Sequence, residues 1–284
     1  MYLKCGHAKL KSYELIMESG TGSHLNSELT LRWELALLKL KRDVENKVYT
    51  LEESYDSAEK MRLDFMNNGV VPTSKIVNIH VQLCGRISAA MQVIDIYMSE
   101  NVECSIYAFN SAITLAGNIA RASCYFMALR KQQLYSSIKL VAEQTTRNST
   151  DENLDIIFET LFFFNVVPNI VTINVLLNIA SNDTEIGKIF ACGAKLRLAP
   201  LLITFNIMIA RAESFNFALA YFRELKMYRY IPDIITLTTL LKKTESLKQV
   251  KMTEQLLRAE KTETNYDWQK QMANKKSLFT SIQN

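Results

Sequence analysis

The clearest unit of the chain reads Ile203–Thr204–Phe205–Asn206, then Ala218–Leu219–Ala220–Tyr221–Phe222–Arg223–Glu224–Leu225, then Pro232–Asp233. This unit recurs along the chain at a fixed spacing, and the positions of the four prolines reveal the spacing. They are Pro72, Pro168, Pro200 and Pro232, separated by 96, 32 and 32 residues. A period of this length is typical of proteins built from stacked helical hairpins.

A polar column keeps the same 32-residue spacing, six residues after the proline register. It comprises Asn46, Asn78, Asn110, Ala142, Asn174, Asn206 and Thr238. A column of mostly small residues follows twelve positions later: Ala58, Ala90, Ala122, Leu154, Ile186, Ala218 and Val250. Four positions on comes a column rich in aromatic residues: Arg62, Ile94, Phe126, Phe158, Phe190, Phe222 and Glu254. Three positions further lie Phe65, Tyr97, Leu129, Leu161, Gly193, Leu225 and Leu257.

The last three columns form an i, i+4, i+7 stripe, which predicts an amphipathic helix that we call helix B. A preceding helix A is predicted around the polar column, because Phe205 and Ile209 share one face of it while Asn206 lies off that face. Each hairpin has too little apolar surface to be stable alone, so neighbouring hairpins must stack. The sequence therefore predicts an all-α fold, an α-α superhelical solenoid of helix-turn-helix repeats with an extended concave surface.

Three regions follow from the register. Residues 46–263 are predicted to hold seven repeats, with Asn46 opening the first helix A. Residues 1–45, where Leu29, Trp33, Leu37 and Leu40 have helical spacing, are predicted to form a degenerate N-terminal helical cap. Residues 264–284 are predicted to be a polar C-terminal helix and tail. The middle repeat is degenerate, and its turn at 145–151 is predicted to be a surface loop.

Composition excludes several other classes of protein. Eight glycines and four prolines in 284 residues are too few for the turns of sandwiches, barrels or propellers. Neither GxGxxG nor GxxxxGK[ST] occurs, the five cysteines form no CxxC pair, and the three histidines form no HExxH motif. We therefore expect no cofactor, no metal site and no disulfide framework, and cysteines that act as small buried apolar side chains.

The sequence predicts neither a membrane span nor a recognisable targeting segment. The most apolar stretch, 154–180, is interrupted by Glu159, Asn165 and Pro168, so no membrane span is predicted. Residues 1–18 show neither a secretory signal nor an Arg-rich transit peptide.

The repeat unit resembles the pentatricopeptide repeat, whose pattern reads VTYN, then AL-x-LF-x-x-M, then PD. Val167–Pro168–Asn169–Ile170–Val171–Thr172–Ile173–Asn174 is similar to it, and so is Met66–Asn67–Asn68–Gly69–Val70–Val71–Pro72. The resemblance covers about four-fifths of the chain. The family usually repeats at about 35 residues, and the shorter period here places the difference in the turn between helices A and B.

The resemblance implies a solenoid of an organelle, mitochondrial or other, that binds single-stranded RNA with one base read per repeat by two side chains. In each repeat, one of the two base-reading side chains belongs to the polar column. The other is the residue directly after the proline register, and these residues together are called the post-proline column. The implied pairs are Asn46/Thr73, Asn78/Ser105, Asn110/Ser137, Asn174/Leu201, Asn206/Asp233 and Thr238/Asn265. The family's code implies uracil for Asn with Asp, cytosine for Asn with Ser and adenine for Thr with Asn. Ala142/Asn169 and Asn174/Leu201 do not fit it.

The residues alone leave an alternative open for the asparagines, which could simply open helix A by capping it. Charge favours the C-terminal third for any phosphate contacts: residues 186–284 carry 16 Lys+Arg and 8 Asp+Glu, whereas residues 1–185 carry 17 and 21. The candidate phosphate contacts are Lys188, Lys195, Arg197, Arg211, Lys242, Lys243 and Lys248. A solvated helix face would explain the same residues.

Two function classes remain. The first is a non-catalytic RNA-associated protein of an organellar ribonucleoprotein, such as a mitochondrial ribosome or an RNA-processing complex, with RNA and neighbouring proteins as partners. The second is a protein scaffold of the tetratricopeptide type, which exposed Phe162, Phe163 and Phe164 would suit unless helix B buries them. No catalytic residue, membrane contact or small-molecule substrate is expected. His80 is expected to be a satisfied core or surface histidine.

Overall fold

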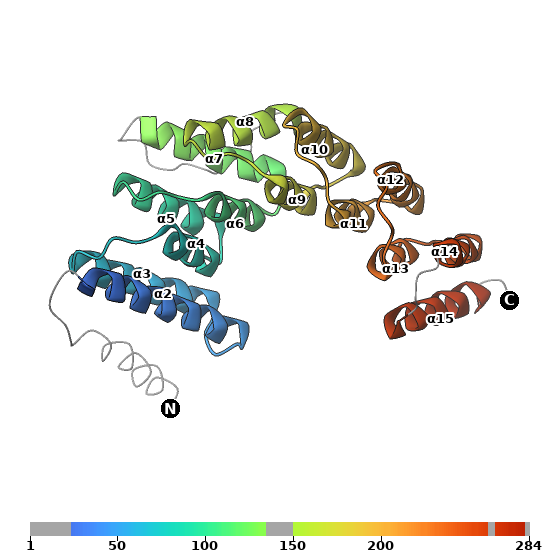
Figure 1. Ribbon diagram of the computed structural model, residues 1–284, viewed down its shortest axis with the longest axis horizontal. Coiled ribbons are helices and arrows are strands. Elements are labelled where there is room, and N and C mark those ends of the chain that lie inside the picture. Colours follow the sequence, from blue (N-terminus) through green and yellow to red (C-terminus); the bar gives the residue numbers. More distant parts are fainter. Residues whose placement is uncertain (1–23, 135–149, 261–264, 282–284) are drawn as a thin grey trace. The chain divides into compact units, whose positions relative to one another are not determined.

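The computed structural model describes residues 24–134, 150–260 and 265–281, and within these ranges the chain consists of helices and the turns between them (Figure 1). The all-α class is thereby confirmed. The helices are α2 (His24–Glu45), α3 (Leu51–Asn67), α4 (Ser74–Leu83), α5 (Ile87–Ser99), α6 (Ile106–Ala116), α7 (Ile119–Leu134), α8 (Thr150–Phe163), α9 (Ile170–Ile179), α10 (Asp183–Lys195), α11 (Leu202–Arg211), α12 (Phe215–Met227), α13 (Ile234–Lys242), α14 (Leu247–Ala259) and α15 (Tyr266–Ser281).

The 32-residue register is visible in where the helices begin. Starts at Ser74, Ile106, Ile170, Leu202, Ile234 and Tyr266 differ by 32 or 64 residues, and so do starts at Ile87, Ile119, Asp183, Phe215 and Leu247. The helices of the first set that carry the polar column, α4, α6, α9, α11 and α13, are the A helices, and α15 begins in the same register. The helices that carry the three columns of helix B are α3, α5, α7, α8, α10, α12 and α14, of which α3 and α8 begin outside the second set of starts. The repeated helical hairpin is thus the building unit of the chain, as predicted.

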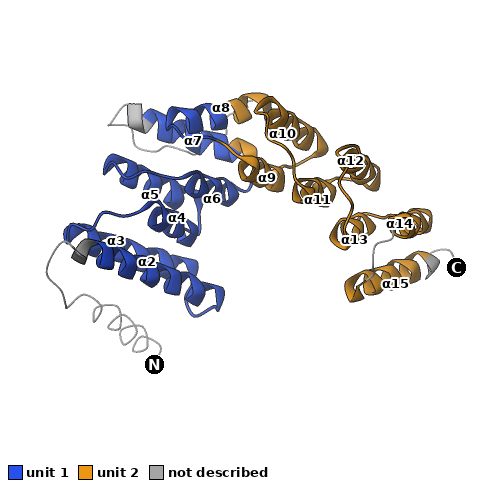
Figure 2. Cartoon of the chain, in the orientation of Figure 1, with its two compact units in different colours: residues 1–117, 121–146, 156–167 blue, residues 118–120, 147–155, 168–284 orange. Residues whose placement is uncertain are grey.

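The chain forms two compact units (Figure 2). Unit 1 comprises residues 1–117, 121–146 and 156–167, and unit 2 comprises residues 118–120, 147–155 and 168–284. In unit 1, α2, α4 and α6 pack in succession, with α3 and α5 packed against them. In unit 2, α9, α11, α13 and α15 pack in succession, with α10, α12 and α14 as their hairpin partners. Within each unit, the A helices therefore form one continuous layer.

The first predicted repeat differs from the register. Asn46 does not open a helix, because the long helix α2 continues to Glu45 and Asn46 lies in the turn that follows it. The next helix, α3, begins at Leu51 behind the N-cap Thr50, whose hydroxyl accepts from the Glu53 amide. The helix A expected around Ala142 and the residues before His24 lie outside the described residues. Thr150 begins α8, and α15 is the predicted polar C-terminal helix.

The three columns of helix B form the core, as predicted. Every residue of the small-residue column is buried, from Ala58 to Val250. Phe126 and Phe222 are buried in the aromatic column, as are Tyr97 and Leu225 in the last column. The described cysteines are free, and Cys84, Cys104 and Cys124 are buried. None of the described helices has the length and apolar character needed to cross a membrane.

The helix B ends repeat as closely as the starts. Gly69, Asn101, Asn165, Arg197 and Arg229 share one register position and all have positive φ. In each case the following amide donates back to a carbonyl five residues earlier, as Val70 does to Phe65 and Tyr230 does to Leu225. This is the Schellman arrangement, which satisfies the last carbonyls of a helix.

Candidate functional site

The polar column occupies the fifth position of successive A helices. Asn78 lies in α4, Asn110 in α6, Asn174 in α9, Asn206 in α11 and Thr238 in α13. These residues are therefore inside the helices and do not cap them, so the capping alternative is wrong for them. Asn46, in the turn after α2, is separate from this set.

The post-proline column supplies the N-caps of the A helices instead. The Thr73 hydroxyl accepts from the Ile76 amide, and the Asp233 carboxylate accepts from the Thr236 amide at 2.7 Å. The Asn265 side chain accepts from the Trp268 amide at 2.9 Å and so caps α15. Ser105 and Leu201 are the N-cap residues of α6 and α11 without a side-chain cap bond. Ser137 lies outside the described part of the chain.

One of the implied pairs, Asn206 and Asp233, is bridged by a third side chain in the structure. The Thr236 hydroxyl lies 2.7 Å from Asn206 Oδ1 and 2.8 Å from Asp233 Oδ1. A hydroxyl has one proton, so it donates to one of these oxygens at a time. Thr236 itself is fully buried beneath the two side chains. The connection holds Asn206 of α11 and Asp233 at the start of α13 as one polar group.

The other members of the polar column differ in how available they are. Asn78 Oδ1 accepts from Gln82 of its own helix and from Ser111 of α6, at 3.3 and 3.4 Å. The Thr238 hydroxyl donates to the Ile234 carbonyl. Asn110 is only 5% exposed, and its amide nitrogen and oxygen are both buried without a hydrogen-bond partner. Asn110 is therefore the member least able to meet a ligand without a rearrangement of its side chain.

A column of exposed apolar residues accompanies the polar one. Tyr107, Val171, Ile203 and Ile235 are the second residues of α6, α9, α11 and α13, and they are 56%, 41%, 56% and 62% exposed. Each lies three residues before a polar-column residue, so the two are neighbours on one helix face. Sequence reasoning missed this column, although apolar residues at a 32-residue spacing outside the core stripe were a usable signal.

Three basic residues with the same spacing bind helix ends. Arg211 donates to the Ala180 carbonyl at 2.5 Å, Lys243 to the Ala212 carbonyl at 2.7 Å and Lys275 to the Thr244 carbonyl at 2.7 Å. Each cation thus satisfies a carbonyl just beyond the end of the preceding A helix, where the helix dipole favours positive charge. Arg211 and Lys243, two of the predicted phosphate contacts, have a structural role in unit 2.

The remaining predicted phosphate contacts are scattered. Lys188 of α10 pairs with Asp151 at 2.8 Å. Lys195, Arg197 and Lys242 are exposed, at or just after helix ends. Lys248 lies on α14, a B helix, and not on the A helices. The structure therefore does not gather the seven candidates beside the polar column.

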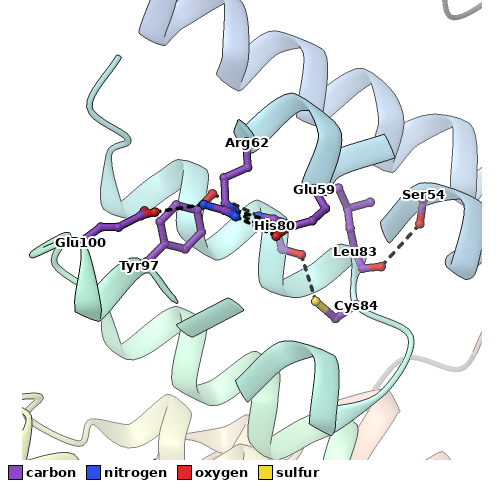
Figure 3. Close-up of polar contacts among 8 residues, drawn as sticks. All are labelled: Ser54, Glu59, Arg62, His80, Leu83, Cys84, Tyr97 and Glu100. Carbon is purple, nitrogen blue, oxygen red and sulfur yellow. Dashed lines mark hydrogen bonds and ion pairs between the residues drawn. The ribbon is translucent and has the colours of Figure 1, made fainter. Parts of the chain in front are cut away.

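A buried polar cluster joins α3, α4 and α5 in unit 1 (Figure 3). Arg62 pairs with Glu59 at 2.9 Å and with Glu100 at 3.1 Å, while His80 Nδ1 lies 3.1 Å from the Tyr97 hydroxyl and His80 Nε2 lies 3.5 Å from Glu59. Burial, aided by the charge of Arg62 and opposed by that of Glu59, lowers the pKa of His80 to about 4. Burial also raises the pKa of the Cys84 thiol to about 12. His80 is thus a neutral core histidine whose Nδ1 is satisfied, whereas its buried Nε2 has no hydrogen-bond partner, so the expectation of a satisfied histidine holds only in part. The cluster is a structural tie between three helices.

Groups of histidine, cysteine and carboxylate side chains able to hold a metal ion are absent from the described ranges. Phe162 and Phe163, at the end of α8, are 47% and 40% exposed, and Arg130 lies over the Phe163 ring at 5.4 Å from its centre. Phe164 instead stacks on Phe109. Two of the three phenylalanines are therefore exposed, and the third is partly buried.

No family model and no curated protein matches the chain. Among solved structures it is similar to the pentatricopeptide repeat protein PPR10 in complex with an 18-nucleotide psaJ RNA element, and to the same complex with three cysteines replaced by serine. In each case the identity is 17%, the TM-score is 0.34, and the match covers 94% of this chain and 48% of the other. The chain thus spans about half the length of those proteins. Its own helices, which restart every 32 residues as hairpins, form an array of α-α repeats similar to the pentatricopeptide repeat.

Proposed function

We propose that the chain is a non-catalytic protein that binds single-stranded RNA along the A helices, as a component of an organellar, most simply mitochondrial, ribonucleoprotein. One observation carries the RNA-binding part of the proposal. In unit 2, three successive A helices each present an exposed β-branched aliphatic residue and, one turn later, a partly exposed polar side chain, which is Asn174, Asn206 or Thr238. Unstacked bases need an apolar contact for their faces and polar groups for their edges.

Asn206 and Asp233 form the best-defined reading group. With Asn206 Oδ1 engaged by Thr236, the Asn206 amide protons remain for an acceptor on a base. Both contacts that Thr236 makes with the Asp233 carboxylate use Oδ1, which leaves Oδ2 for a donor. Uracil offers carbonyl acceptors on either side of an N–H donor, so its edge complements this pair, and the family resemblance implies the same base.

The charge of the chain supports moderate affinity. The formal net charge is +4, and several of the basic residues are engaged with carboxylates or helix ends. The net positive charge is small, so the logarithm of the binding constant is expected to fall with the logarithm of the salt concentration with a slope of about −2 to −3, corresponding to three or four released counterions. Specificity would then depend mainly on the A helices.

The direct test is selection of RNA from a random single-stranded pool by the purified chain, followed by sequencing and by titrations at several salt concentrations. We expect enrichment of uracil followed by adenine, for Asn206/Asp233 and then Thr238/Asn265. Asn206→Ala should remove the uracil preference and weaken binding of the selected RNA by about tenfold, whereas Asn67→Ala, an exposed asparagine at the end of α3, should change neither. Binding that is absent, or enrichment that Asn206→Ala leaves unchanged, contradicts the proposal.

A gain of specificity gives an independent test. Leu201 is the N-cap of α11 and the partner implied for Asn174, but its side chain cannot hydrogen bond. Leu201→Asp recreates the Asn206/Asp233 combination one repeat earlier and also supplies a helix cap worth about 1 kcal/mol. Selection with this variant should enrich one additional uracil, directly before the first. A variant with higher stability and an unchanged RNA preference would argue against base reading.

The cellular part of the proposal rests on the family resemblance and is tested separately. A fluorescently tagged full-length protein should colocalise with an organelle marker and sediment with ribonucleoprotein particles in a ribonuclease-sensitive manner. A uniformly cytosolic protein would contradict it.

A further inference from the structure

A groove separates two B helices of unit 2, away from the polar column. It has a volume of about 930 Å³ and lies between α12 and α14. The A helices of the same repeats, α11 and α13, pack against each other. The groove is therefore a feature of the opposite layer of the hairpins, and the RNA-binding proposal leaves it unexplained.

The walls of the groove combine an apolar floor with a basic rim. Leu247 and Met252 of α14 line it with partly exposed apolar side chains, next to the nearly buried Phe215 and Leu219 of α12, and Lys248 and Lys251 of α14 line it with exposed side chains. None of its ten lining residues is a carboxylate. The two lysines lie three residues apart and so share a helix face. The groove has a net positive charge with nothing in its walls to neutralise it.

From this combination we propose that the groove binds an acidic peptide segment of a partner protein, with the apolar side chains of the peptide on the floor and its carboxylates at Lys248 and Lys251. A volume of about 930 Å³ is at the upper end of ordinary ligand pockets and accommodates several side chains. Opposite charges across an interface fix register and increase association rates.

The apolar lining of the groove favours a peptide over a nucleic acid as its ligand. Phe215, the aromatic residue of the lining, is only 2% exposed, so its ring offers no face on which a base could stack. Single-stranded nucleic acids depend on such stacking surfaces in addition to positive charge. Aliphatic and thioether side chains, in contrast, form good contacts with apolar peptide side chains.

The test is selection from a phage-displayed library of random 16-residue peptides against the full chain. Retained peptides are expected to place two or three Asp or Glu residues beside apolar ones. Affinity of a synthetic copy of the most enriched peptide is then measured by fluorescence anisotropy. Lys248→Glu/Lys251→Glu should weaken binding by about tenfold, and a peptide with its acidic residues replaced by lysine should bind the double variant better than the natural chain.

The matched control is Lys195→Glu/Lys270→Glu, which reverses two exposed lysines elsewhere in unit 2 and should leave peptide affinity unchanged. Circular dichroism establishes that both double variants keep their helix content. Enrichment of neutral or basic peptides, no enrichment, or equal loss in the control variant overturns the proposal. Displacement of the peptide by single-stranded RNA at the same affinity as RNA binding by the A helices would make nucleic acid the occupant and overturn it as well.

Discussion

At the scale of single residues, the buried cluster around His80 makes unit 1 sensitive to acid. His80 is fully buried among Tyr97, Glu59 and Arg62, and burial lowers its pKa from the ordinary 6.5 to about 4. As the pH falls from 6.5 to 4, the unfolded chain takes up a proton at this position that the folded chain does not. The free energy of unfolding should therefore fall across this window, by up to about 3 kcal/mol, and be unaffected by His80 above pH 7.

Urea unfolding at pH 7.0, 6.0, 5.0 and 4.5 measures this effect. Trp33 is buried in unit 1, so its fluorescence in a Trp268→Phe background reports on that unit. His80→Leu removes the titration and should flatten the pH dependence, even if loss of the Tyr97 contact lowers stability at all pH values. Equal pH dependence in the natural chain and the variant would assign the acid sensitivity to other groups.

Residue roles were predictable from sequence only where they repeat. The polar column, the proline register and the buried columns recur every 32 residues, so their places in the helices followed from counting. The Thr236 link between Asn206 and Asp233 depends on how neighbouring A helices meet, and no spacing reveals it. Arg62 and Glu254 are the two charged residues of their column, and the spacing does not reveal that Arg62 pairs with Glu59 of its own helix and with Glu100 at the end of α5.

At the scale of helices, the left-handed residue that follows α12 offers a stability test. Arg229 has φ of 62° at a position where its equivalent in the first repeat is Gly69. A side chain with a Cβ is strained in this region, and glycine is not. Arg229→Gly should therefore raise the free energy of unfolding of unit 2 by about 0.5–1 kcal/mol, measured by urea unfolding.

Arg223→Gly is the matched control. Arg223 lies six residues before Arg229 and is exposed in the interior of α12. Glycine there should lower stability by about 1 kcal/mol, since it adds backbone freedom to the unfolded chain without relieving strain. A decrease for both variants would mean that Arg229 makes a contact worth more than its backbone strain.

Helix boundaries were predicted well where proline, asparagine or glycine marks them and poorly at the first repeat. Asn46 matched the period, yet α2 runs to Glu45, because the apolar face of Trp33, Leu37 and Leu40 continues the helix up to that point. The basic residues Arg211, Lys243 and Lys275 share the period as well. The charge of Arg211 and Lys243 suggested phosphate binding, whereas all three residues lie beside backbone carbonyls that need donors.

At the scale of the whole molecule, each of the two compact units has its own buried residues and contains one of the two tryptophans. Trp33 is buried in unit 1 and Trp268 in unit 2. In a repeat protein, stability is a sum of contributions from each repeat and its neighbours, so a core defect destabilises the adjacent repeats first. The two cores should therefore respond separately to local substitutions.

Phe222→Ala tests this, because Phe222 is a 3% exposed aromatic residue in the best-matched repeat of unit 2. The cavity should lower the free energy of unfolding by about 3–5 kcal/mol. The Trp268 fluorescence transition should then occur at a lower urea concentration, and the Trp33 transition should be unchanged. Phe126→Ala, in the equivalent column of unit 1, should shift the Trp33 transition and leave that of Trp268. Equal shifts of both transitions by either variant would show a single cooperative core, and no shift with Phe222→Ala would contradict the 32-residue register that places this side chain between helices.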